Sequence, residues 1–303
     1  MSASAARPYT ILSILAALAT IALKFAAYWL TDSIGLLSDA MESCVNLIAA
    51  LVAFWALSLA AKPPDAEHPF GHSKAEYFSS GLESALILVA AFSICFAAIG
   101  RLLHPLPIEQ VGLGLLLSLV ATVINGGVAL ILLGAGRRLR SITLRADAHH
   151  LLTDVWTSVG VVIGLLLVQW TGWFILDPLI AIGVAVNIIW AGYRLMRETG
   201  SGLLDQALVI EEQNLIRDIL AAYRGRGVEF HALLTRVAGA RRFVSFHVLT
   251  PGNWTIQHGH DLCDEIELAI AQALPHTHVI THLEPIEDPI SWDDQQLDRK
   301  LRQ

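Results

Sequence analysis

Six long apolar runs fill the first 200 residues of this chain and limit its possible folds more strongly than any other feature. Each run is about as long as the ~20 residues that an α-helix needs to cross the hydrocarbon core of a bilayer. The chain is 54% hydrophobic and 16% charged, with a mean hydropathy of +0.56, which excludes an ordinary soluble protein of this length. We therefore predict an α-helical membrane protein with six transmembrane helices, at residues 9–30, 34–60, 78–102, 110–134, 144–169 and 176–197.

Lysine and arginine gather at one end of these runs, and this sets the expected orientation. Because cytoplasmic loops are enriched in Lys and Arg, we predict that both termini are cytoplasmic. Arg101 is the clear exception on the other side. The basic end carries Arg7, Lys62, Lys74, Arg137, Arg138, Arg140, Arg145, Arg194 and Arg197.

The last hundred residues are polar and predict a separate domain. Their periodicity indicates a helix at 211–223, strands at 228–237 and 242–249, a helix at 256–274 and a strand at 277–283. The order α-β-β-α-β predicts a small, ferredoxin-like α/β domain. We place a transmembrane domain at 1–204, a cytoplasmic domain at 205–290 and a flexible tail at 291–303. The formal charge of −7 argues against a nucleic-acid partner.

Two of the apolar runs contain polar residues that a membrane segment holds only at a cost. Glu42 and Asn46 in the second run, and His150 and Asp154 in the fifth, are four residues apart, so each pair shares a helix face. At ~1.5 Å per residue, both pairs reach the middle of the bilayer from opposite sides. One nitrogen and three oxygen atoms suit zinc or a similar divalent metal, so we predict a metal site here.

A buried ion pair that locks the two helices together is the alternative interpretation of these residues. Asp39 and Asp147 lie near helix ends, where carboxylates usually stabilise the first turn, and we interpret them as capping, supporting or entrance groups. His149 lies ~100° around the helix from His150, so we do not expect it to be a ligand.

The polar stretch DAEHPFGHSKAE, between the second and third runs, is a second candidate metal site. Asp65, His68 and His72 fall within it, and Pro69 and Gly71 indicate a turn that can wrap an ion. A solvated loop is the alternative.

Seven of the 12 histidines lie beyond residue 205. We expect His231 and His247 on adjacent strands and His282 on the last strand, with Glu284 on the same face as His282. Cross-strand neighbours can share a metal, so we predict a third site here, with surface histidines as the alternative.

The six spans, the paired polar positions, the HPFGHSKAE loop and the small α/β domain together resemble the cation diffusion facilitator family. The likeness is to its bacterial zinc and iron efflux type and covers about residues 10–286. It implies a homodimer in the bacterial inner (cytoplasmic) membrane whose cytoplasmic domains pack together. It also implies cation efflux by alternating access, as a metal/proton antiporter with zinc as the expected cargo, and no enzymatic activity.

Carried over by position, the resemblance assigns three metal sites, with zinc or another divalent transition metal as substrate and regulatory ligand. Asn46 departs from the family pattern, which usually has Asp there. Because an amide offers an oxygen but does not titrate, we expect lower affinity or fewer coupled protons. The sites are Glu42, Asn46, His150 and Asp154 for transport, Asp65, His68 and His72 in the loop, and His231, His247, His260, His282 and Glu284 in the cytoplasmic domain.

Three alternatives to zinc export stay open. Another cation, such as iron(II), cadmium, cobalt, nickel or manganese, is the nearer alternative to zinc. An intramembrane metal hydrolase is the more distant one, because zinc can activate a bound water. Against the hydrolase, the chain has no HExxH or GxSxG motif. A membrane metal sensor without flux is the third alternative.

Overall fold

The computed structural model describes residues 2–31, 34–103, 113–173 and 175–293. The chain divides into two compact units, Met1–Ser201 and Gly202–Gln303.

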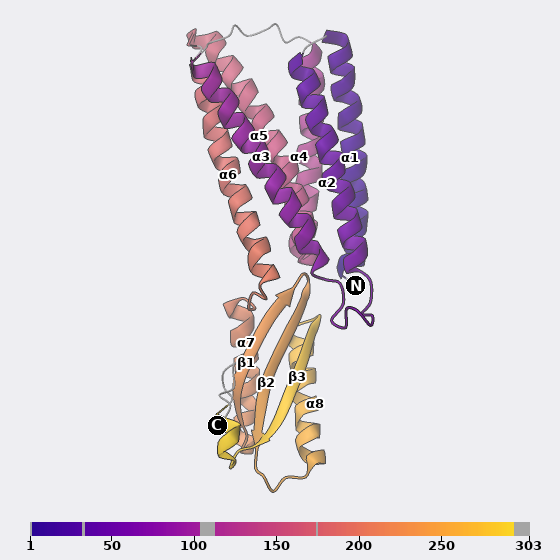
Figure 1. The fold of residues 1–303 in the computed structure, drawn as a ribbon, viewed down its shortest axis with the longest axis vertical. Helices are drawn as coiled ribbons and strands as arrows, with labels where there is room; N and C mark the ends of the chain where they lie inside the picture. The colour runs from indigo at the N-terminus through magenta and orange to yellow at the C-terminus, as the bar shows by residue number, and fades with distance from the viewer. Residues whose placement is uncertain (1, 32–33, 104–112, 174, 294–303) are drawn as a thin grey trace. The chain divides into compact units, whose positions relative to one another are not determined.

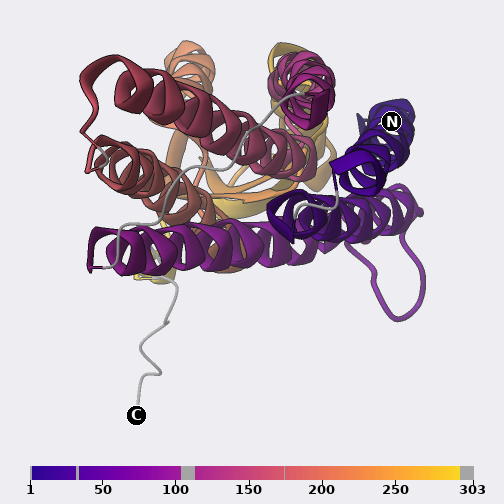
Figure 2. The ribbon, with the colours of Figure 1, turned by 90° about the horizontal axis from the view of Figure 1, so that it is seen from above.

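The described part of the first unit consists of six long helices, as the sequence predicts (Figure 1). Several of them, such as α1 and α6, run past the apolar stretches, because polar residues continue the helical backbone there. Figure 2 looks along the bundle and shows the segment between α2 and α3 projecting to one side. The helices are α1 (Ser2–Thr31), α2 (Ile34–Ala60), α3 (Ala75–Leu103), α4 (Leu113–Leu139), α5 (Ile142–Thr171) and α6 (Leu176–Leu203).

Four of these helices contain a described stretch long and apolar enough to cross a membrane, and they are α1, α3, α4 and α6. In α2 the described apolar stretch is the shorter segment Asn46–Ala60. At ~1.5 Å per residue, the 27 residues of α2 and the 30 of α5 are still long enough to span. Large apolar side chains such as Trp29, Phe96 and Trp170 point outward, as lipid-facing residues do.

Small residues let the helices approach closely. Along α2, the side chains of Ala49, Ala53 and Ala56 are fully buried, and this helix packs against α1, α3 and α5. Because lipid gives no hydrophobic drive between helices, close van der Waals packing and interhelical hydrogen bonds hold such a bundle together.

The described part of the second unit has the predicted order α-β-β-α-β. Its three strands follow the order β1-β2-β3, with β1 and β2 antiparallel and β2 and β3 parallel. Every second residue of β2, including Val244, Phe246 and Val248, packs into the apolar core that the helices cover. The intervening residues therefore face the other side of the sheet. The elements are α7 (Ile210–Tyr223), β1 (Glu229–Ala238), β2 (Arg241–Thr250), α8 (Ile256–Ala273) and β3 (Thr277–Pro285), with short 3-10 helices at Arg224–Arg226 and Pro289–Trp292.

Ordered structure continues past residue 290, where the sequence predicts the tail to begin. Ser291 is buried and its hydroxyl donates to the carbonyl oxygen of Pro285. The Trp292 ring lies edge-on to His231, with centroids 5.8 Å apart. These contacts hold the segment against the sheet. Residues 294–303 of the predicted tail lie outside the described residues.

Helix α8 packs tightly on β3 at Gly259, and replacing this glycine by alanine tests the packing. A Cβ there would lie 2.4 Å from Leu283 Cδ2, so the leucine or the helix must move. We expect the local free energy of unfolding to fall by about 1–3 kcal/mol, measured by hydrogen exchange of the α8 amides in the full chain. Gly225→Ala is the matched control, because nothing lies within 4 Å of a Cβ there. Equal exchange in the two variants would contradict the close contact.

Candidate metal centres

Helices α2 and α5 meet through polar side chains that are buried in the bundle. Asn46 on α2 is 3% exposed, and His150 and Asp154 on α5 are 5% and 6% exposed. His150 Nε2 lies 2.5 Å from Asn46 Oδ1, and Asn46 Nδ2 donates to Asp154 Oδ2. The structure thus brings together three of the four residues predicted for the intramembrane site.

The orientation of the Asn46 amide follows from its two neighbours. An ionised Asp154 only accepts hydrogen bonds, so it faces the NH₂ group and leaves Oδ1 to His150. His150 Nε2 must then carry a proton, while His150 Nδ1 has no hydrogen-bond partner among the described residues. A metal can bind once the amide oxygen of Asn46 and the lone pair of a His150 ring nitrogen both face the ion.

Asn125 on α4 also contacts this site, although it is not among the residues predicted from the sequence. Asn125 is 1% exposed, and its Nδ2 donates to Asp154 Oδ2 over 3.3 Å. Its Oδ1 has no hydrogen-bond partner among the described residues. A lone amide within an apolar run is itself a signal, because polar groups in membrane helices usually have a function.

Two predicted positions on α2 cannot be placed in this geometry. Glu42 lies one turn before Asn46 on the helix, but its side chain lies outside the described residues, as does that of Asp39. The role of Glu42 as the fourth ligand therefore stays a prediction.

The loop between α2 and α3 gathers Asp65, His68 and His72. Asp65 Oδ1 lies 3.3 Å from His68 Nδ1, and Asp65 Oδ2 lies 3.3 Å from His72 Nε2. The two rings have centroids 4.5 Å apart. Gly71 adopts a left-handed conformation with φ of +83°, which glycine tolerates best. Its N–H donates to the carbonyl oxygen of His68, and this turn leads the chain back so that His72 reaches Asp65.

The charge on Asp65 is stabilised locally. The backbone N–H of His68 donates to the carboxylate and is the main cause that lowers the pKa of Asp65, and the two imidazoles add to the effect. Because the pKa lies below its ordinary value, the carboxylate stays ionised until the solution is more acidic than usual for Asp. The loop therefore holds an ionised candidate ligand at neutral pH.

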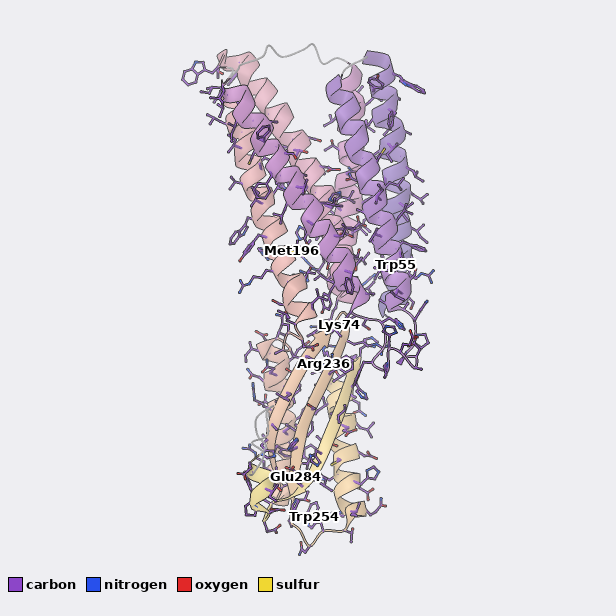
Figure 3. The ribbon with its side chains drawn as sticks, viewed as in Figure 1. Trp55, Lys74, Met196, Arg236, Trp254 and Glu284 are labelled. Carbon is purple, nitrogen blue, oxygen red and sulfur yellow. The ribbon has the colours of Figure 1, made fainter. Side chains whose placement is uncertain are left out.

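The second unit contains another cluster, on the face of its sheet opposite the apolar core. His231 and His247 are direct partners across β1 and β2, and Glu284 lies near the end of β3 (Figure 3). His231 Nε2 lies 3.1 Å from both His247 Nδ1 and Glu284 Oε2, and His247 Nδ1 lies 3.3 Å from Glu284 Oε2. Ligand atoms around a tetrahedral zinc ion are about 3.3 Å apart, given bonds of 2.0–2.1 Å. The donor spacing fits such an ion.

A β-bulge on β1 adjoins this cluster. The register shifts between His231 and Leu234, and Ala232 has a φ of +51°. A bulge adds one residue to a strand and redirects a side chain, and bulges are common beside functional sites. The bulge cannot be predicted from the sequence, because alternation along 228–237 gives no sign of the extra residue.

The other two predicted ligands of this unit differ in position. His282 pairs with His247 across the sheet, and its Nδ1 lies 3.6 Å from Glu284 Oε1. His260 lies on α8, where it faces Asp264 at 3.6 Å, and the structure does not bring it to the cluster within one chain. His282 is therefore adjacent to the cluster, whereas the role of His260 stays a prediction.

Comparison with known proteins gives matches along nearly the whole chain. The family model described as the cation efflux transmembrane domain matches residues 10–204. The model described as the cation efflux protein, cytoplasmic domain, matches residues 209–286.

Individual relatives cover most of the chain as well. An uncharacterized transporter of Synechocystis sp. is 60% identical over 292 residues, which is 96% of this chain and 94% of that protein. The cation-efflux pump FieF of Klebsiella pneumoniae is 32% identical over 268 residues, 88% of each chain. A solved structure of CzrB in a zinc form is 42% identical and covers 28% of this chain and 96% of that one, with a TM-score of 0.27, too low to support a structural conclusion.

Removing the charge of Glu284 tests the cluster on the sheet. We expect Glu284→Gln to weaken zinc binding there by at least about a hundredfold, because lost supporting groups alone cost 10–100-fold. Trp292 reports the event, since its ring lies against His231. Zinc binding is measured as the zinc-dependent change in the tryptophan fluorescence of the full chain. The part of this change that Trp292→Phe abolishes comes from Trp292.

Glu265→Gln is the control for this prediction. It makes the same chemical change at an exposed glutamate that pairs with Arg226, and it leaves zinc binding unaltered. Wild-type zinc affinity in Glu284→Gln would show that the cluster does not bind the metal.

Proposed function

The chain belongs to the cation diffusion facilitator family, of the bacterial type, and from this premise we propose that it exports zinc in exchange for protons through the site between α2 and α5. Members of this family are transporters and not enzymes, so the intramembrane hydrolase is no longer an alternative. The protein is a multi-pass membrane protein that moves divalent metal cations as its substrate.

The contacts of Asn46 with His150 and with Asp154 are the observation that supports this location. The three side chains come from two helices, are nearly inaccessible, and offer one nitrogen and two kinds of oxygen. Within a bilayer, ionisable groups are costly and mark ion pathways. With Glu42 as the predicted fourth ligand, the two carboxylates would balance the charge of a divalent ion.

Zinc is the favoured cargo because of the two other clusters. Both the loop and the sheet combine two imidazoles with one carboxylate, a donor set that suits zinc. Iron(II) accepts the same set, so it is the second candidate, and cadmium, cobalt, nickel and manganese follow.

Proton coupling follows from the chemistry of the ligands. A ring nitrogen of His150 cannot bind metal while it carries a proton, so metal and protons compete for the site. In the cytoplasm-facing conformation His150 is neutral and the carboxylates are ionised, which favours metal binding. In the outward-facing conformation His150 takes a proton and the metal leaves. Transport requires that each ligand stabilises one of the two conformations.

The remaining parts of the proposal concern assembly and location. We infer a homodimer that packs through its cytoplasmic domains, in which metal bound at His231, His247 and Glu284 strengthens the association and raises transport. Both termini are placed on the cytoplasmic side of a bacterial inner membrane, because Lys and Arg gather at that end of the helices.

Flux in proteoliposomes tests the proposal. Purified protein is reconstituted with a metal-sensitive dye inside, a pH gradient is imposed, and zinc, iron(II), cadmium and manganese are added in turn. We expect zinc uptake that needs the gradient and falls at least about a hundredfold in His150→Ala, because a ligand is lost. His149→Ala is the matched control, since this neighbouring histidine faces elsewhere on α5. Zinc flux that does not depend on the pH gradient, or that is unchanged in His150→Ala, would refute the antiport mechanism.

Asn46→Asp tests the consequence of the amide. A carboxylate adds a negative charge and a titratable group, so we expect the KM for zinc to fall by about tenfold at neutral pH, a free-energy difference typical of one added charge contact. The variant should also exchange more protons per metal ion and depend more steeply on pH. Simultaneous recording of zinc and proton flux measures the KM and the proton-to-zinc ratio. Asn125→Asp, which makes the same chemical change on α4, is measured for comparison. An unchanged proton-to-zinc ratio would show that position 46 does not take part in coupling.

A further inference from the structure

Helix α3 presents an unusual buried polar face to the rest of the bundle. Five of its residues over two turns are at most 1% exposed and none is apolar. They are Glu76, Ser79, Ser80, Glu83 and Ser84. Two of the five are carboxylates, which are rarely buried without a partner.

Glu76 is fully explained by its neighbours. Its Oε2 accepts a hydrogen bond of 2.5 Å from the Ser141 hydroxyl, and its carboxylate accepts the backbone N–H groups of Ile142 and Thr143. These are the first amides of α5, so Glu76 satisfies the start of that helix and complements its dipole. Its role is structural.

Among the described residues, no comparable set of hydrogen bonds accounts for the burial of Glu83, or for that of Asp147 on α5. Ser79 donates to Glu83 Oε1 over 3.1 Å, and Ser13 on α1 donates to Asp147. Glu83 Oε2 and Asp147 Oδ2 have no hydrogen-bond partner among the described residues. The side chains are 0% and 1% exposed, respectively.

The two carboxyl groups also act on each other. Helices α3 and α5 pack together, and Glu83 lies within electrostatic reach of Asp147. Two buried carboxylates repel each other and each has lost its water, so the pair must either hold a proton or bind a cation. The two oxygen atoms without partners are positions where a cation can bind.

The pair lies on the route to the site between α2 and α5. Asp147 precedes His150 by three residues, so the two share a face of α5, and Asp147 is ~4.5 Å nearer the start of the helix. That end carries the basic residues Arg137, Arg138 and Arg140, which mark the cytoplasmic side. An ion that leaves the cytoplasm would meet Glu83 and Asp147 before it meets His150.

We propose that Glu83 and Asp147 form a second intramembrane cation site, where a partly hydrated divalent ion pauses between the cytoplasm and the His150 site. Its ligands are oxygen atoms only, which suit hard ions such as manganese(II) and give zinc no nitrogen donor. Selection among metals then takes place at the next site, where His150 supplies a nitrogen ligand. This inference rests on the proposed transport route and adds an earlier step to it.

Two measurements test the proposal. Crystals of the full chain are soaked in manganese(II), and diffraction at the manganese edge locates the ion. We expect a peak between Glu83 Oε2 and Asp147 Oδ2 that disappears in Asp147→Asn. In proteoliposomes, Glu83→Gln should raise the KM for the transported metal about tenfold with a smaller change in maximal rate, as loss of a binding interaction does. The KM of the double variant Glu83→Gln/Asp147→Asn should be no higher than that of either single variant, because all three variants lose the same site.

Glu76→Gln is the control, since it changes an equally buried glutamate on the same face whose partners are the amides of α5. It should lower thermal stability and leave KM unaltered. A peak at His150 without one at Glu83, together with an unchanged KM in Glu83→Gln, would refute this inference and leave the proposed function intact. A proton or an ordered water in place of the ion, with KM unchanged, would refute it as well. Absence of flux in the wild type would instead refute the proposed function.

Discussion

The hydrogen bonds that join Asn46 to His150 and Asp154 are the interaction on which the rest of this structure depends. A polar side chain in the interior of a membrane bundle has no water to turn to, so it needs a partner on another helix. Asn46 supplies that partner to two residues of α5 at once. The same groups that a metal would bind are thus held together by hydrogen bonds without it, and an ion that binds there would have to replace these bonds.

Neutral Asn46 gives this arrangement a particular character. It forms hydrogen bonds with Asp154 and with His150 Nε2 without adding charge, which lowers the cost of burying the site. A carboxylate in its place would bind a cation more strongly but would be harder to bury without one. The two clusters outside the helices use another donor set, two imidazoles and a carboxylate, and the loop cluster is largely exposed whereas Glu284 of the sheet cluster is buried.

The sequence predicts the elements of this fold well and their contacts less well. The helix from Ile34 to Ala60 and the strand from Arg241 to Thr250 follow the predicted ranges to within two residues, because apolar runs and alternation are local patterns. Contacts between helices depend on the packing of the whole bundle. Asn125 and Glu83 were therefore missed, since each gains its significance only from the helix beside it. The separation of His260 from His231 is likewise a matter of tertiary structure.

The ring nitrogens of His150 offer the most direct test of the central claim. The protein is prepared with ¹⁵N-labelled histidine in lipid nanodiscs, the His150 signals are assigned by their loss in His150→Ala, and spectra are compared without and with zinc. The account predicts a protonated Nε2 that donates to Asn46 in the metal-free protein, and a metal-bound ring nitrogen once zinc is added. Unchanged His150 signals, while those of His231 and His247 respond to zinc, would contradict it.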